Sequence, residues 1–99
     1  MGMSYKKGRR LEYEVRDLFA SRGWLVVRAA ASKPVDLVCI RQGQVVLVEC
    51  KYNDRPSSQE LERLSEVSRA TGAKVLLAVR PKYGRLRIID PWTREEYAP

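Results

Sequence analysis

Two strand-like segments separated by only two residues constrain this chain more than any other feature. Residues 35–41 (VDLVCIR) and 44–51 (QVVLVECK) are rich in β-branched and apolar side chains, and Gln42 and Gly43 lie between them. This spacing predicts a β-hairpin, because Gly43 can adopt the positive φ that a two-residue turn requires. Both segments carry charged residues at the end that is far from the turn, where a buried strand would ordinarily stay apolar.

The predicted hairpin brings these charged side chains together. A two-residue turn pairs Arg41 with Gln44 and therefore Asp36 with Glu49. Cross-strand partners point to the same face of a sheet, and Lys51 shares that face because strand side chains alternate. Two adjacent carboxylates repel each other, and a shared divalent cation removes the repulsion. A three-residue or bulged turn would shift the register by one residue and weaken this prediction.

The alternative reading of the same residues is a salt bridge between Lys51 and a carboxylate at the end of a strand. An Asp followed by Glu-x-Lys also occurs by chance in many chains. The spacing therefore gains its weight from the hairpin, from a preceding helix and from the charge of the chain.

The chain is strongly basic. It has 19 Lys and Arg residues against 12 Asp and Glu residues, a net charge of +7 and a pI of about 9.8. This balance favours a polyanionic partner, because basic side chains displace the counterions of nucleic acids. A merely basic soluble surface, or the charge-rich surface of a thermophilic protein, would have the same composition.

The hydrophobic pattern predicts an α/β fold in the order α-β-β-β-α-β-β. An apolar stripe predicts a first helix over residues 5–22, and a capping box of Ser57 and Glu60 begins a second helix that ends near Thr71. Strands are expected at 24–29, 35–41, 44–51, 74–80 and 85–90. A strand–helix–strand connection implies parallel pairing, so we expect a mixed five-stranded β-sheet flanked by helices.

The residue types present limit the choice of metal. The chain has no histidine and no Cys-x-x-Cys motif, which excludes a zinc site of cysteine and histidine ligands. Oxygen ligands favour Mg²⁺ or Mn²⁺. Cys39 and Cys50 lie within apolar runs, and we expect free thiols. The first ten residues lack the apolar core of a signal peptide, and no run is long enough to span a bilayer, so we expect a cytoplasmic protein without a membrane partner.

Three segments together resemble the archaeal-type (Hjc-like) Holliday junction resolvases of the PD-(D/E)xK nuclease superfamily: YKKGRRLEYEV (5–15), VVRAAASKPVDLV (26–38) and VLVECK (46–51). The resemblance extends over roughly residues 5–90. It implies a restriction-endonuclease-like core and a single nuclease domain over residues 1–99. It also implies a homodimeric endonuclease that resolves four-way (Holliday) DNA junctions by paired symmetric nicks. Such an enzyme uses Mg²⁺, which Mn²⁺ can replace, and needs no nucleotide cofactor.

The resemblance also implies roles for individual residues. The catalytic set is Glu12, Ser32, Asp36, Glu49 and Lys51. The metal ligands are Glu12, Asp36, Glu49 and the backbone carbonyl of Cys50. On a helical wheel, Glu12 and Glu14 flank the apolar stripe equally well, so the residues alone do not choose between them. Tyr13 stands where relatives often have Arg.

Seven basic residues are candidates for DNA contact: Lys6, Lys7, Arg9, Arg10, Arg28, Lys33 and Arg55. Four of them lie at the beginning of the first helix, Lys6, Lys7, Arg9 and Arg10, and form a cluster that suits a phosphate clamp or, alternatively, a solvated helix face. Other interpretations of the whole chain are a repair or restriction nuclease of the same superfamily, a non-catalytic nucleic-acid-binding module and a basic interaction domain.

Apolar residues near the C-terminus are expected to lie on an edge strand: Leu86, Ile88, Ile89 and Trp92. An exposed edge of this kind needs a cover. A dimer partner or the protein's own chain would provide it. Trp24 is expected in the core.

Overall fold

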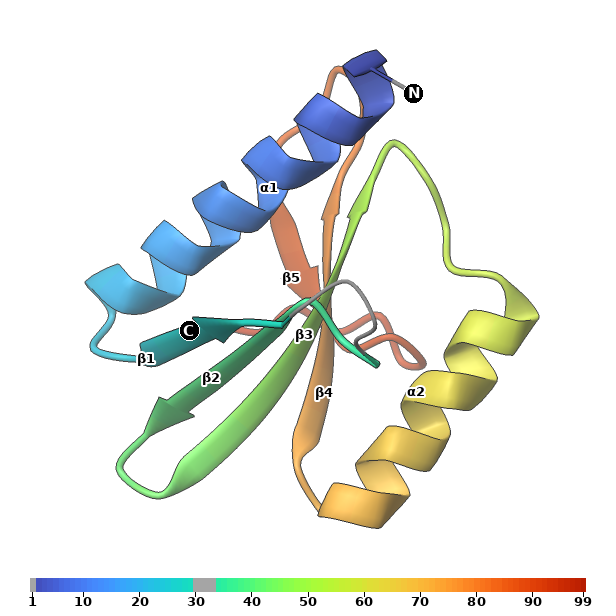
Figure 1. The fold of residues 1–99 in the computed structure, drawn as a ribbon. Coiled ribbons are helices and arrows are strands. Elements are labelled where there is room, and N and C mark those ends of the chain that lie inside the picture. Colours follow the sequence, from blue (N-terminus) through green and yellow to red (C-terminus); the bar gives the residue numbers. More distant parts are fainter. Residues whose placement is uncertain (1, 30–33) are drawn as a thin grey trace.

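The computed structural model describes residues 2–29 and 34–99, with side chains from residue 7 onward. Its elements are α1 (Gly2–Ser21), β1 (Leu25–Arg28), β2 (Leu37–Arg41), β3 (Gln44–Tyr52), α2 (Ser58–Thr71), β4 (Lys74–Arg80) and β5 (Arg87–Ile89) (Figure 1). This order confirms the prediction. The first helix begins three residues earlier than the expected start at residue 5, and the last strand is shorter than expected.

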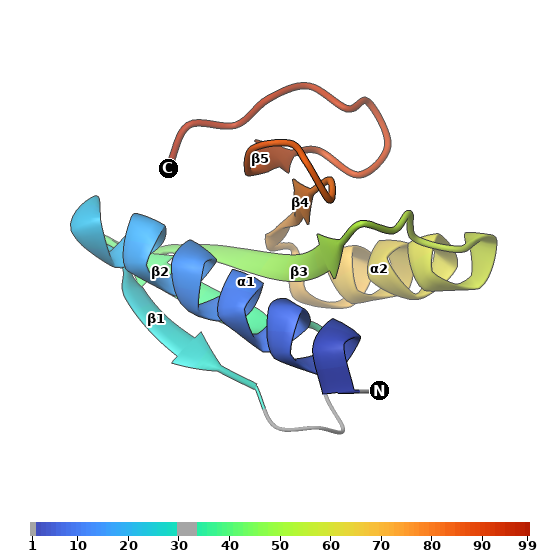
Figure 2. The ribbon, with the colours of Figure 1, turned by 90° about the horizontal axis from the view of Figure 1, so that it is seen from above.

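The five strands form one mixed sheet in the order β1-β2-β3-β4-β5. All neighbours are antiparallel except β3 and β4, which are parallel and joined through α2, as the strand–helix–strand pattern predicted. Helix α1 packs on one face of the sheet and α2 on the other (Figures 1 and 2). Neither described helix has the length and apolar character that crossing a lipid bilayer requires.

The β2–β3 hairpin has the predicted register. Its pairs run from Arg41 with Gln44 to Leu37 with Val48. The two turn residues, Gln42 and Gly43, have φ values of 50° and 81°, which a two-residue hairpin turn requires. A shift by one residue would have moved the apolar side chains of both strands to the wrong face.

Strand β3 supplies side chains to two separate cores because its residues alternate between faces. Val46 and Val48 pack under α1, whereas Leu47 packs with Leu64 of α2. Glu49 continues the odd-numbered series and faces the α2 side of the sheet. The predicted core position of Trp24 is confirmed, since this residue is buried with its ring edge-on to Phe19 at a centroid distance of 5.7 Å.

The C-terminal segment covers the β5 edge. Glu96 bridges Ile89, and the amide of Tyr97 donates a 2.8 Å hydrogen bond to the carbonyl of Ile88. Ile88 and Ile89 are buried within the monomer. Of the two covers that the sequence left open for this edge, a dimer partner or the protein's own chain, the structure shows the protein's own chain. Trp92 remains about half exposed.

Exposed apolar side chains gather instead on β1, β2 and β3. Leu25 pairs with Ile40, and Ile40 pairs with Val45, so these three residues form a row across the strands. Val27 lies two residues from Leu25 on the same face. All four side chains are more than a third exposed, and we call them the apolar face.

Candidate active site

Two buried carboxylates meet where the β2–β3 hairpin ends. Asp36 directly precedes β2, and its amide donates a 3.0 Å hydrogen bond to the carbonyl of Val48, the residue whose register partner is Leu37. The side chains of Asp36 and Glu49 interact, as the hairpin predicted. Asp36 is 6% exposed and Glu49 5%, and they are the only charged residues that are buried within the described part of the chain. A second bond fixes Asp36: the amide of Cys50 donates to its Oδ2 at 2.8 Å.

The electrostatics of Glu49 show that this arrangement is unfavourable without a cation. Burial, followed by the charge of Asp36, raises the pKa of Glu49 to about 7, although Lys51 and Arg63 act in the opposite direction. Oε1 of Glu49 is buried without a hydrogen-bond partner among the described residues. A buried oxygen without a partner is costly, so its presence beside a second carboxylate fits a site for a divalent cation.

Lys51 reaches the same face and is held by the beginning of α2. Its Nζ donates a 2.6 Å hydrogen bond to Oε2 of Glu60. Oε1 of Glu60 accepts from the amide of Ser57 at 2.8 Å, and the Ser57 side chain accepts from the amide of Glu60. The hydrogen bonds from Lys51 and from the Ser57 backbone lower the pKa of Glu60. The predicted capping box is thus confirmed, and its acidic residue also positions Lys51.

Helix α2 contributes a second residue, Arg63, whose Nη2 lies 3.5 Å from Oε2 of Glu49. Glu60 and Arg63 are one helical turn apart, so both face the site. The sequence identified Glu60 only as a helix cap. The capping box was the available signal, because it starts the helix shortly after the strand that carries Lys51.

Glu12 lies on the other side of the sheet, in an ion pair with Arg28. Nη2 of Arg28 is 3.0 Å from Oε1 of Glu12, and the guanidinium also lies over the ring of Tyr13. Among the described residues, no group of three or more acidic, cysteine or histidine side chains is close enough to hold one metal ion. The structure therefore unites Asp36 and Glu49 but does not add Glu12 to them.

The charge of Glu12 nevertheless acts close to the carboxylate pair. Burial, then Asp36, then Glu12 raise the pKa of the Cys50 thiol well above its usual range. Glu14, the other wheel candidate, instead forms an ion pair with Arg80 of β4. Of the two helix glutamates, Glu12 is therefore the one whose charge reaches Cys50, the neighbour of Glu49. Both cysteines are free thiols, as expected.

The predicted DNA-contact residues have different surroundings. Lys7 lies over the ring of Tyr52 and, with Arg10 and Lys82, lines a cavity of about 410 Å³. Arg9 is exposed on α1, and Arg55 is exposed on the loop between β3 and α2. Ser32, Lys33 and the side chain of Lys6 lie outside the described residues.

Comparison with known proteins gives one consistent result. The family model described as archaeal Holliday junction resolvase (Hjc) matches residues 3–98. The crossover junction endodeoxyribonuclease Hjc of Methanocaldococcus jannaschii is 33% identical over 96 residues, which cover 93% of this chain and 71% of that protein. The structure of Hjc, a Holliday junction resolvase from Archaeoglobus fulgidus, superposes with a TM-score of 0.74 at 22% identity and covers 86% of this chain and 73% of its own. The range that the family model matches spans the positions of Asp36, Glu49 and Lys51.

Proposed function

The chain belongs to the archaeal Holliday junction resolvase (Hjc) family, and from this we propose that it cuts four-way DNA junctions by paired symmetric nicks. The observation that carries the chemistry is the buried pair of Asp36 and Glu49 next to Lys51. Two carboxylates and an ammonium on one face suit hydrolysis of a phosphodiester, with water as the nucleophile and no nucleotide cofactor. The proposed substrate implies that the protein acts inside the cell.

The donor set suits Mg²⁺, with Mn²⁺ as a substitute. Asp36, Glu49 and the backbone carbonyl of Cys50 would hold the ion, since all three offer oxygen ligands. When bound, a divalent cation withdraws charge from the scissile phosphate and promotes the ionisation of water. The unpartnered Oε1 of Glu49 supports this assignment. Glu12 would contribute from α1 when Arg28 turns from it to a DNA phosphate.

Lys51 would stabilise the negative charge that develops on the phosphate. The Lys51 side chain is 16% exposed and Glu60 holds its ammonium, so this group need not be ordered during the reaction. Ser32, four residues before Asp36 in the sequence, is proposed to assist. The role of Glu60 is to position Lys51, not to contact DNA.

Binding would be directed to the phosphate backbone and to the shape of the junction, not to base sequence. We assign the phosphate contacts to the seven basic residues that the sequence indicates: Lys6, Lys7, Arg9, Arg10, Arg28, Lys33 and Arg55. Lys7 and Arg10 share a cavity with Lys82, which supports a cluster of phosphate contacts next to the N-terminal part of α1.

We further propose that the protein acts as a homodimer. A four-way junction has two-fold symmetry and needs two cuts, which two symmetry-related sites supply. The apolar face of Leu25, Val27, Ile40 and Val45 supports this state, because a contiguous row of exposed apolar side chains is typical of an interface.

A direct test compares a synthetic four-way junction with a linear duplex of the same sequence, each with Mg²⁺ and with EDTA. We expect symmetric nicks in the junction alone and only with the metal. Equal degradation of both substrates would indicate a general nuclease of the superfamily. Binding without cleavage would contradict the enzymatic assignment.

A further inference from the structure

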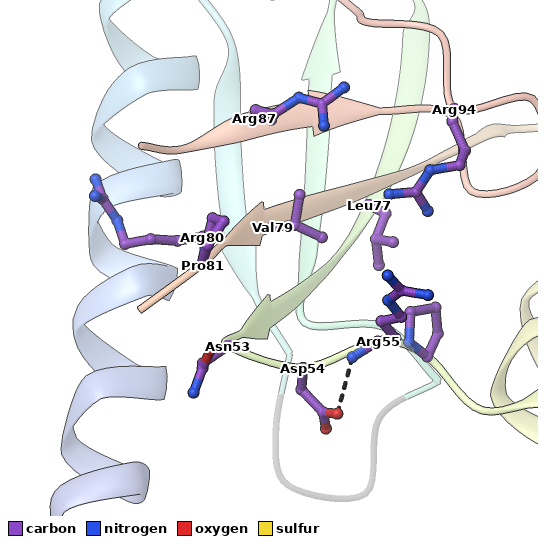
Figure 3. Close-up of a pocket in the computed structure, with 10 residues that line it drawn as sticks. Asn53, Asp54, Arg55, Leu77, Val79, Arg80, Pro81, Arg87 and Arg94 are labelled. Carbon is purple, nitrogen blue, oxygen red and sulfur yellow. Dashed lines mark hydrogen bonds between the residues drawn. The ribbon is translucent and has the colours of Figure 1, made fainter. Parts of the chain in front are cut away.

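A second cationic cavity lies beside the carboxylate pair, and the catalytic assignment does not use it. It has a volume of about 560 Å³ and lies between the loop that follows β3, strands β4 and β5, and the C-terminal segment (Figure 3). Leu77 and Val79 form its floor, and these residues are the register partners of Glu49 and Lys51. The cavity is therefore one strand, about 4.8 Å, from the site and on the same face of the sheet.

The charges around this cavity are unequal. Four arginines line it, Arg55, Arg80, Arg87 and Arg94, against one carboxylate. That carboxylate, Asp54, accepts a 2.8 Å hydrogen bond from the amide of the next residue. Figure 3 shows its carboxylate pointing away from the guanidinium groups of Arg55 and Arg94.

Two of the four guanidinium groups already have acidic partners. Arg80 pairs with Glu14, and Arg87 donates from Nε to Glu96 at 2.9 Å. The other two, Arg55 and Arg94, have no side-chain hydrogen bond or ion pair among the described residues. The cavity therefore carries two positive charges that the protein itself does not neutralise.

These two side chains converge. Arg55 reaches Leu77 from the β3–α2 loop and Arg94 from the C-terminal segment, so their guanidinium groups lie on either side of it (Figure 3). Like charges placed face to face are unfavourable unless an anion lies between them. Two guanidinium forks of this kind suit the oxygens of a phosphate group.

The backbone holds Arg94 in this position at some cost. Its φ is 65°, in the left-handed region that non-glycine residues seldom adopt. Its amide donates to the carbonyl of Asp90, whose side chain in turn accepts from the amides of Trp92 and Thr93. Such conformations persist where the surroundings enforce them and are concentrated at functional sites.

We propose that this cavity binds a backbone phosphate of the DNA strand near the scissile phosphate, with Arg55 and Arg94 as its ligands. The proposal rests on the proposed function, because it assumes that DNA lies across the carboxylate pair. It extends the DNA-contact surface to the C-terminal segment. A phosphate held one strand away would fix the position of the strand relative to Glu49 and Lys51.

The test measures affinity of the full-length chain for a fluorescent four-way junction in EDTA over a range of salt concentrations. The test variant is Arg55→Gln/Arg94→Asn, because asparagine tolerates a positive φ. The control is Arg22→Gln/Arg69→Gln, which removes the same charge from two exposed residues near the C-terminal ends of α1 and α2. Thermal unfolding of both variants checks that they fold.

We expect the test variant to bind about tenfold more weakly, the loss expected for one charge-assisted contact. The plot of log affinity against log salt should become less steep by about 0.9, the contribution of one phosphate contact. Arg94→Lys should keep the slope because it keeps the charge. A test variant that matches the control in both quantities would overturn the proposal.

Inorganic phosphate separates a DNA site from a site for small anions. If millimolar phosphate raises the unfolding temperature of the wild type but not of the test variant, and the junction slope is unchanged, the cavity binds small anions and the proposal is wrong. Cleavage of the same junction with Mg²⁺ is measured in parallel. If the wild type and the test variant differ in salt slope as expected but the wild type does not cut the junction, the phosphate site is supported. That result would refute only the resolvase activity.

Discussion

The backbone amide of Cys50 donates a 2.8 Å hydrogen bond to Oδ2 of Asp36, and this bond holds one carboxylate beside another. Asp36 lies just outside the β2 ladder, so its side chain would otherwise be free to turn away from Glu49. Instead a main-chain group of β3 aims it across the hairpin. A strand that is buried on both faces can thus end in a rigid acidic pair.

Replacing Asp36 should separate the structural from the catalytic use of its carboxylate. Asp36→Asn keeps an oxygen that can accept from Cys50, so we expect near-normal stability and junction binding. We expect cleavage to fall at least about a hundredfold, because the charge that a cation requires is gone. Asp36→Ala should lower the free energy of unfolding by roughly 1–3 kcal/mol more, since the Cys50 amide loses its hydrogen-bond partner. Urea unfolding and a nicking assay measure the two effects; normal cleavage by Asp36→Asn would refute the site.

The raised pKa of Glu49 predicts an unusual pH dependence of stability in the absence of metal. The folded protein keeps a proton on Glu49 up to about pH 7, whereas the unfolded chain releases it near 4.5. Because the folded state binds more protons in this window, the free energy of unfolding should decrease as pH rises from 4.5 to 7. Glu49→Gln removes this loss of stability. Above pH 7, its free energy of unfolding should therefore exceed that of the wild type by up to about 3 kcal/mol.

Adding Mg²⁺ at pH 8 provides the complementary measurement for Glu49. The cation should raise the unfolding temperature of the wild type and leave Glu49→Gln unchanged, since a ligand that binds only the folded state stabilises it. If the difference in free energy of unfolding between the wild type and Glu49→Gln stays constant from pH 4.5 to 8, the raised pKa of Glu49 in a buried carboxylate pair is contradicted.

Glu60→Gln tests whether Glu60 positions Lys51. Glutamine can still complete the capping box, so stability should change by less than about 0.5 kcal/mol. Cleavage should fall about tenfold or more, because Lys51 loses the carboxylate that aims its ammonium at the site. Glu62→Gln, a charge change on an exposed residue of the same helix, is the matched control. Equal cleavage rates in single-turnover measurements of the two variants would rule out the positioning role.

Ile40→Glu tests the proposed dimer. Ile40 is the centre of the row formed with Leu25 and Val45, and it is 37% exposed in the monomer, so a charge there should be tolerated by the fold. We expect light scattering to report a shift from dimer to monomer. On a supercoiled plasmid with an extruded cruciform, the variant should give nicked circles in place of linear product. Gln44→Glu serves as the control, and an intact Ile40→Glu dimer would place the interface elsewhere.

Local sequence signals predicted the elements of this fold well because they depend on neighbouring residues. The turn at Gln42 and Gly43 and the two-residue alternation set the hairpin register, and with it the meeting of Asp36 and Glu49. Ser57 and Glu60 marked the beginning of α2 by the same kind of local signal. The cover over β5 was harder to predict, since it depends on where a short irregular segment returns to the sheet.

Residue order alone predicts the order of elements, the parallel pair β3–β4 and the carboxylate pair at the hairpin end. The packing of the whole chain places Lys51 against Glu60, pairs Glu12 with Arg28, and brings Arg55 and Arg94 to either side of Leu77. This difference arises because strand register follows from turn length and side-chain alternation, which are local. Contacts between helices, loops and the C-terminal segment depend on how the two cores pack, and this packing involves the whole chain at once.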